Sequence, residues 1–222
     1  MKKLLFLFVL GFGLIAFSAC TSNLANQEAP IGEDSNNSIN TAINNEVAPV
    51  LIDGSYVVDV NASQMTWHAS RVIASDHTGL IQIKNGNLDV SEGNLMGANF
   101  IIDMNSISSD EGLDALVGHL KSEDFFDVAN YPEAFLEINN VTYLDGAYQI
   151  TADLGIKGTV SSITFPAQIT TEADRLLATA AFSIDRTVWD IRYGSGKFFE
   201  DLGDKTIKDE IDFTIQLEAQ RQ

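Results

Sequence analysis

The side chains that could do chemistry are few and far apart. The three histidines, His68, His77 and His119, lack the close spacing of a metal-binding motif, and the chain has a single cysteine. The sequence GSGK at residues 194–197 does not have the spacing of a phosphate-binding P-loop, and the G-x-S-x-G elbow of hydrolases does not occur. We therefore expect no metal site and no catalytic group, and predict that the protein is not an enzyme.

Three basic residues, Arg186, Arg192 and Lys197, fall within twelve positions of a chain that is otherwise acidic. In one interpretation, which we favour, they form ion pairs with nearby acids, namely Asp185, Asp190 and Glu200. In the other, they contact the anionic or polar head group of a ligand, because a guanidinium group matches the geometry of phosphate. The sequence leaves both interpretations open.

The lone cysteine, Cys20, stands in the setting of a bacterial export signal. Two lysines come first, an apolar run of 14 residues follows at 4–17, and the small pair Ser18-Ala19 precedes the cysteine. The run is shorter than the roughly 20 residues that a membrane-spanning helix needs. We predict a lipoprotein signal peptide at 1–19 and lipid attachment at Cys20. The protein would then be anchored in the bacterial cell envelope and face the periplasm, with the outer membrane favoured over the inner.

Residues 20–52 are predicted to be the lipidated cysteine and a flexible tether, and residues 53–222 a folded domain. The stretch from 21 to 52 contains seven Asn and no aromatic residue, so it cannot bury much apolar surface. Removal of the signal takes the 13 basic residues to 11 and leaves the 31 acidic ones, which changes the formal net charge from −18 to −20. This excess of acid argues against nucleic acid as a partner.

Apolar and polar residues alternate with a period of two through most of the folded part, which is typical of strands with one buried face. In the segment 96–104, one face carries only apolar residues, namely Met96, Ala98, Phe100, Ile102 and Met104. Further strands are predicted at 56–60, 64–71, 79–90, 134–141, 148–156, 163–169, 176–185 and 207–217, with a hairpin turn at Asp145-Gly146. About eight antiparallel strands without covering helices form either a sandwich or a closed barrel, and an eight-stranded barrel is either filled or holds one small ligand.

One segment, at about residues 110–127, has a helical period instead. Leu113, Leu116, Val117 and Leu120 lie at i, i+3, i+4 and i+7. Ser108 and Glu111 are spaced like a capping box at the start of this helix. Two phenylalanines follow, at 125 and 126. The segment either closes one end of the barrel with apolar side chains or is a lid over the mouth of a cavity.

At these residues the sequence resembles the YceI-like family of lipocalin-like barrels that bind polyisoprenoid lipids. The resemblance rests on four stretches, which are "HLKSEDFFDVANYPEAF" at 119–135, "YVVDVNASQMTWHA" at 56–69, "IKGTVSSITFP" at 156–166 and "FSIDRTVWDIRYGSG" at 182–196. It extends from Tyr56 to about Ala219 and implies an all-β, antiparallel eight-stranded barrel with an apolar tunnel.

The resemblance implies a set of residues that line this tunnel, namely Trp67, Phe100, Ile102, Leu116, Leu120, Phe125, Phe126, Phe135, Phe165, Phe182 and Phe213. Residues expected near the head group at the mouth are His119, Arg186, Arg192 and Lys197. The implied function is non-catalytic binding, storage or transport of an isoprenoid lipid, of the prenyl quinone or polyprenyl phosphate type, with no other cofactor. The acylated Cys20 would make the membrane a partner, and an open barrel mouth would permit a homodimer. The alternative is a solid-core envelope scaffold or stress protein that binds a protein partner through its acidic surface.

Overall fold

The structure is a computed structural model that describes residues 47–73 and 76–222. All described residues belong to one compact unit, which extends to Gln222. The predicted signal peptide, Cys20 and most of the predicted tether lie outside the described residues. Within the described part, no helix has the length and apolar character needed to cross a membrane.

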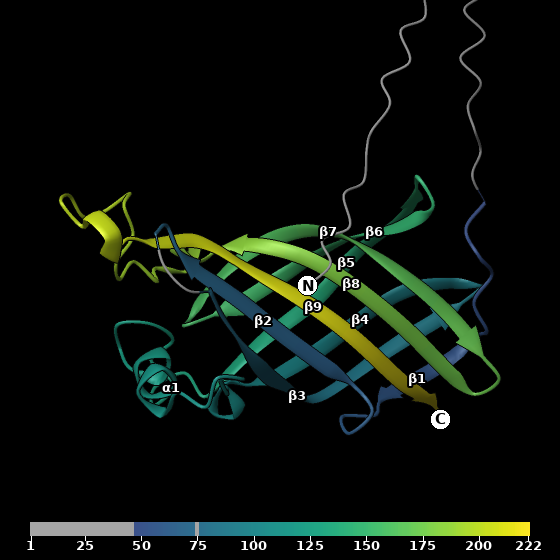
Figure 1. Ribbon diagram of the computed structural model, residues 1–222. Coiled ribbons are helices and arrows are strands. Elements are labelled where there is room, and N and C mark those ends of the chain that lie inside the picture. Colours follow the sequence, from purple (N-terminus) through teal and green to yellow (C-terminus); the bar gives the residue numbers. More distant parts are fainter. Residues whose placement is uncertain (1–46, 74–75) are drawn as a thin grey trace, which may run out of the picture. The chain divides into compact units, whose positions relative to one another are not determined.

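Nine antiparallel strands make up this unit (Figure 1). They are β1 (Gly54–Val58), β2 (Gln64–Arg71), β3 (Asp76–Ser91), β4 (Asn94–Asp103), β5 (Glu133–Leu144), β6 (Ala147–Ile156), β7 (Thr159–Glu172), β8 (Arg175–Asp185) and β9 (Ile207–Arg221). Each strand from β3 to β9 pairs with the next, while β3 and β9 are joined through β1 and β2. The sheet is therefore closed into a barrel without a free edge.

The nine strands occupy eight positions around the barrel, because β1 and β2 share one position. Both pair with β3 on one side and with β9 on the other, β1 near one end of the barrel and β2 toward the opposite end. The turn at residues 59–63 separates them. The predicted eight-stranded antiparallel barrel is confirmed, with one of its strands interrupted.

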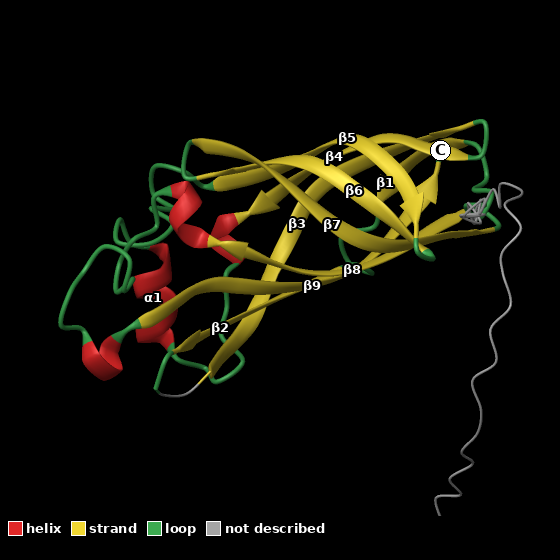
Figure 2. Ribbon diagram, turned by 90° about the horizontal axis from the view of Figure 1, so that it is seen from above, coloured by secondary structure: helices red, strands yellow, loops and turns green. Residues whose placement is uncertain are grey.

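The two ends of the barrel are built differently (Figure 2). The end that we call the hairpin end carries the tight turns after β3, β5 and β7, together with the C-terminus. The predicted turn at Asp145-Gly146 lies here, and its φ angles of 53° and 76° are the positive values that a two-residue hairpin turn of type I′ requires. The other end, which we call the helical end, carries α1 (Asp114–Lys121) and the 3-10 helices η1 (Met104–Ser106), η2 (Arg186–Trp189) and η3 (Gly203–Lys205).

The predicted helix at about 110–127 is confirmed as α1, but its predicted capping box is wrong. The helix begins after Leu113, which makes no side-chain cap. The Ser108 hydroxyl instead bonds the backbone of Leu80, and the Ser108 amide donates to the Leu80 carbonyl at 3.0 Å. Ser108 thus extends the hydrogen bonding of β3 and is not available to the helix.

The predicted inner face of β4 is confirmed except at Met96, which is 65% exposed, whereas Leu95 is 5% exposed. The register between β3 and β4 shifts at this point, since Asp89 pairs with Gly97 but Val90 pairs with Leu95. Met96 is therefore the extra residue of a β-bulge, and such a residue reverses which neighbour points inward.

The packed part of the chain begins earlier than predicted, because the tether was expected to extend through residue 52. Leu51 is 2% exposed and belongs to the core cluster that contains Tyr56 and Tyr148. A second cluster fills the helical end around Trp67, Trp189 and Phe125. The interior between these two clusters is where a ligand would have to lie.

Candidate functional site

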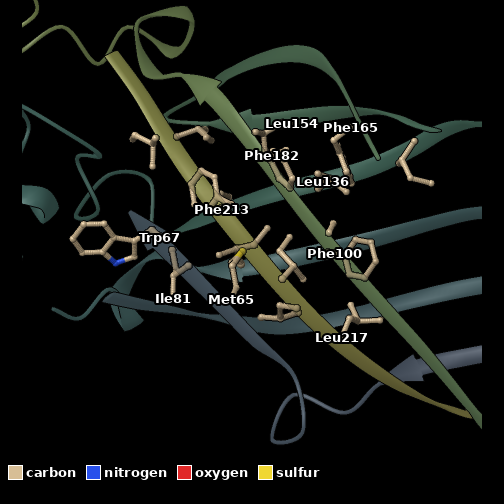
Figure 3. Close-up of a pocket in the computed structure, with 18 of the residues that line it drawn as sticks. Met65, Trp67, Ile81, Phe100, Leu136, Leu154, Phe165, Phe182, Phe213 and Leu217 are labelled. Carbon is tan, nitrogen blue, oxygen red and sulfur yellow. The ribbon is translucent and has the colours of Figure 1, made fainter. Parts of the chain in front are cut away.

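The barrel interior contains a cavity of ≈ 180 Å³ (Figure 3). A single buried water needs about 10–15 Å³ in a polar setting, so this space is far larger than a packing defect. Of the 34 residues that line it, only Thr179, Arg186 and Lys208 are polar. The cavity does not agree with the solid core of the scaffold alternative, and its lining matches an apolar molecule.

The cavity exists because large and small side chains alternate on the inner wall. Phe165, Phe182 and Phe213 stand beside one another on β7, β8 and β9, with ring centroids 4.4 and 5.8 Å apart. Alanines occupy other inward positions and leave the space that a larger side chain would fill, namely Ala69, Ala134, Ala167, Ala178 and Ala180. In Figure 3 the labelled side chains of opposite strands point into this shared interior.

Nine of the eleven predicted tunnel residues line the cavity, namely Trp67, Phe100, Ile102, Leu120, Phe125, Phe126, Phe165, Phe182 and Phe213. Leu116 does not, because it packs one helical turn away from Leu120 among the residues of the helical-end cluster. Leu120, Phe125 and Phe126 are the lining residues that come from α1 and the segment after it. This segment therefore covers the helical end of the cavity.

The structure also places Phe135 outside the cavity, which corrects the prediction. Its neighbours Ala134 and Leu136 face inward on β5, so Phe135 points outward and is 36% exposed. Its ring covers Gly155 of β6, where an added Cβ would lie 2.1 Å from the ring. Phe135 thus covers a glycine on the outer surface, an arrangement that shields exposed backbone between strands.

Arg186 is a buried structural residue and not a head-group contact, which is a second correction. It is 1% exposed and donates to the carbonyl oxygens of Ile191, Lys208 and Ile207 at 2.8, 3.2 and 3.4 Å. It also donates to Asp209 at 3.3 Å. Burial lowers the pKa of the guanidinium from its usual range, and the charge of Asp209 opposes this. Although Arg186 touches the cavity wall, its hydrogen bonds are directed at the protein.

Lys197 and Arg192 form the ion pairs of the favoured interpretation. The Lys197 ammonium lies 2.6 Å from Asp185 and 3.3 Å from Asp209, and the bond to Asp185 raises the pKa of Lys197. Arg192 lies 2.7 Å from Asp190. Its guanidinium also lies 4.6 Å from the ring centroid of Phe198. The predicted partner Glu200 forms no ion pair with a described residue.

His119 connects α1 to the loop that follows η2. Its imidazole lies 3.2 Å from Asp124, and its ring centroid is 4.9 Å from Phe125 and 4.7 Å from Tyr193. Tyr193 was not predicted, and it is the partner that ties this loop to the cover of the cavity. In the described part of the chain, no group of three or more His, Cys, Asp and Glu residues could hold a metal ion.

Three cations that were not predicted lie at the helical end, namely Arg71, Lys205 and Lys208. Lys208 reaches the cavity wall at the start of β9, but its side chain is on the exposed face of the strand, and Arg71 pairs in register with its neighbour Ile207. None of the three charged groups forms a hydrogen bond or an ion pair with a described residue. The sequence around each residue does not indicate this arrangement, because Arg71 comes close to the start of β9 only when β2 pairs with β9.

Apolar side chains are exposed around the same end. Tyr193, Phe198 and Phe199 are 44%, 46% and 50% exposed, and Val72 and Ile73 of the β2–β3 connection are 56% and 67% exposed. The Val72 amide donates to the carbonyl of Thr206, in the loop that carries the phenylalanines. The helical end therefore presents an apolar rim, composed of these five residues, next to the cavity.

The fold and the cavity define a single-domain antiparallel barrel with an apolar interior. More particularly, the chain belongs to the YceI-like family, whose model, the YceI-like domain, matches residues 56–219. No curated protein matches the sequence.

Solved structures share this fold at low sequence identity. BcnA of Burkholderia cenocepacia is 20% identical, with a TM-score of 0.61, and the match covers 72% of this chain and 98% of that one. A polyisoprenoid binding domain from Saccharophagus degradans, implicated in plant cell wall breakdown, is 15% identical with a TM-score of 0.58, over 77% of this chain and 100% of that domain. The YceI protein of Campylobacter jejuni is 18% identical, with a TM-score of 0.51, over 61% and 79% of the two chains.

Proposed function

We propose that the protein binds one isoprenoid lipid in the barrel cavity and stores or carries it without chemical change. The observation that carries the proposal is an internal cavity of ≈ 180 Å³ whose lining is apolar at 31 of 34 positions. Membership of the YceI-like family and the fold shared with a polyisoprenoid binding domain support it. A prenyl quinone and a polyprenyl phosphate are the two ligand types that we consider.

The apolar wall accounts for affinity without polar contacts. Each buried CH₂ contributes about 0.8 kcal/mol, so one isoprene unit contributes several kcal/mol when it leaves water. We propose that the prenyl tail lies inside the barrel among the apolar side chains of the cavity wall. The tail would lie between Phe100 on one wall and Phe182 and Phe213 on the other.

We place the head group at the helical end, near Arg71, Lys205 and Lys208. These residues lie on β2, in η3 and on the outer face at the start of β9, and none of the three has an ion-pair partner among the described residues. Unpaired cations favour a phosphate or another oxygen-rich head group. These residues replace Arg186, Arg192 and Lys197 in the proposal, since those three are engaged in pairs within the protein.

We further propose that acylated Cys20 holds the protein in the cell envelope, facing the periplasm, and keeps the barrel close to the membrane that supplies the lipid. A chain of about 30 residues spans roughly 30 Å as a random coil. The basis is the sequence of residues 1–52 alone.

Native mass spectrometry tests the binding proposal on the chain from Thr21 to Gln222, purified from cells and from a membrane-free synthesis. We expect the first sample to carry one lipid per chain, and organic extraction to yield a prenyl compound. The second sample should take up an added prenyl quinone or polyprenyl phosphate. A protein that emerges empty and takes up neither compound would rule the proposal out.

A further inference from the structure

On most of the barrel wall the cavity ends one layer of side chains before the hairpin end; the exception is Leu95 of β4, which pairs with Val90 and lines the cavity. Four strands show where the cavity ends. On each of them, one inward residue lines the cavity, and the next inward residue toward the hairpin end does not line it. The pairs are Leu88 and Val90 on β3, Ile150 and Tyr148 on β6, Ala178 and Leu176 on β8, and Leu217 and Ala219 on β9. The second members, with Tyr56 of β1, are 0–5% exposed and form a floor beneath the cavity.

The residues before β1, which we call the N-terminal segment (47–53), lie against this floor. Leu51 is 2% exposed within the same core cluster, while its neighbour Val50 is 82% exposed. The Leu51 amide donates to the carbonyl of Gly93, at the turn after β3, at 3.0 Å. The next amide, of Ile52, donates to the hydroxyl of Thr171 on β7 at 2.9 Å. Since β3 and β7 lie on different sides of the barrel, the N-terminal segment crosses its end.

Two floor tyrosines hold the N-terminal segment in place through their hydroxyl groups. Tyr148 donates to the carbonyl of Pro49 at 2.8 Å, and Tyr56 donates to the carbonyl of Ile52 at 2.7 Å. Each ring is almost fully buried in the floor, while each hydroxyl reaches the backbone above it. The hydroxyl groups of these two floor tyrosines thus join the floor to the backbone of the N-terminal segment.

The N-terminal segment lies outside the part of the chain that defines the family. The family match begins at residue 56, two positions after β1 starts, so it contains the barrel and the floor tyrosines but not Leu51. The buried Leu51 side chain therefore lies before the matched region. It occupies the one end that α1 and the loop after η2 do not cover.

We propose that the N-terminal segment closes the hairpin end and sets the depth of the cavity, and thereby the longest isoprenoid chain that the protein binds in full. The inference rests on the proposed function and adds a determinant of specificity to it. A tail that is too long must leave methylene groups in water or displace the floor side chains, which pack in one cluster with Leu51. Each methylene left unburied weakens binding roughly fourfold, so affinity should stop rising with chain length once the tail reaches the floor.

A graded series of prenyl alcohols, from farnesol upward, tests the inference by competition against a fluorescent fatty-acid probe. For the unaltered chain from Thr21 to Gln222, we expect affinity to rise with each isoprene unit and then level off or fall at a defined length. Leu51→Ala should move this limit to a longer alcohol and raise affinity for the first excluded one about tenfold, as expected for one or two more buried methylenes. Val50→Ala, at the exposed neighbouring position, is the matched control and should leave the limit unchanged.

Tyr148→Phe provides a second, milder variant, because it keeps the ring and removes only the bond to Pro49. It should shift the limit in the same direction by loosening the N-terminal segment. A limit that stays in place in both Leu51→Ala and Tyr148→Phe overturns the inference, as does the absence of any limit in the unaltered chain. If no prenyl alcohol binds, the proposed function fails instead, and a series of linear alkanols still tests whether the N-terminal segment sets the depth.

Discussion

Arg186 donates a hydrogen bond to Asp209 across 3.3 Å, and both side chains are shielded from solvent, at 1% and 9% exposure. Asp209 stands on the inward face of β9, between Ile207 and Ile211, where every other inward residue of the strand is apolar. Three backbone carbonyls accept the remaining bonds of Arg186. The pair fixes η2 and the start of β9 relative to each other at the helical end of the cavity.

Replacing Arg186 should destabilise the fold strongly. Arg186→Gln leaves the buried Asp209 with only the half-exposed Lys197 as a cationic partner, and breaking a buried pair in this way costs about 3–5 kcal/mol. Chemical denaturation, read by tryptophan fluorescence, measures the loss in the free energy of unfolding. Arg192→Gln is the matched control, since the Arg192 side chain is 54% exposed and its pair with Asp190 is worth less than about 1 kcal/mol. Equal losses in the two variants would contradict a structural role for Arg186.

His68 gives the fold a dependence on pH. Its imidazole lies 3.0 Å from Asp212, and this hydrogen bond raises the pKa of His68 above its usual value near 6.5. The folded state therefore binds the proton more tightly than the unfolded state. The resulting stability is fully present below about pH 6.5 and is lost as the pH rises through the higher pKa of the folded state. We expect the free energy of unfolding to decrease over that interval.

Two variants test the assignment to this pair by denaturation at a series of pH values. His68→Gln should remove the decrease, and Asp212→Asn should remove most of it, because the carboxylate raises the pKa of His68. The Ser183 hydroxyl, which also donates to Asp212, remains in both variants. A decrease that persists unchanged in His68→Gln would assign it to other groups.

The period of two in the sequence predicted the antiparallel strands and located β2 at its true bounds of 64–71, while the choice of a barrel over a sandwich came from the family resemblance. The prediction of inward-facing residues failed where one extra residue shifted the alternation along a strand. Met96 is the extra residue of a bulge, and a bulge depends on pairing with β3 that no local pattern reports. Phe135 was expected in the tunnel from the family resemblance, although Ala134 and Leu136 carry the inward phase of β5. The alternation along β5 was there a better guide than the resemblance.

The charged residues of the site were harder to predict than its apolar wall. Arg186, Arg192 and Lys197 are close in sequence, but closeness does not tell whether a charge faces a ligand or an acid of the same protein. One sign was present, since Asp209 interrupts the apolar face of β9 and a buried carboxylate requires a partner. The unpaired cations Arg71 and Lys208 could not be found, because they are brought together by the pairing of strands distant in sequence.

Filling the cavity should abolish lipid binding without loss of the fold. Ala180 lines the cavity, and Ala180→Phe would place a ring where the lipid tail is proposed to lie. A ring that displaces two or three methylenes of the ligand costs about 0.8 kcal/mol for each, so affinity for a prenyl alcohol should fall roughly 10- to 100-fold, while the melting temperature should change little because the ring enters an existing cavity. Ala181→Phe is the control, because Ala181 is exposed on the outer face of the same strand. Equal affinity in the two variants would mean that the lipid binds elsewhere.

The apolar rim at the helical end should control how fast a lipid moves between the barrel and a membrane. Phe198 and Phe199 are half-exposed beside the cavity, and full burial of such a side chain contributes about 1.5–3 kcal/mol. Phe198→Ser combined with Phe199→Ser should therefore slow the transfer of a fluorescent prenyl lipid from vesicles to the protein roughly tenfold or more, with little change in equilibrium affinity. Leu144→Ser combined with Met96→Ser removes residues of similar exposure, 57% and 65%, at the hairpin end and should leave the rate unchanged. If the second double variant slows lipid transfer more than the first does, the lipid enters at the hairpin end. That result would contradict both the closed floor and the role of the apolar rim in transfer.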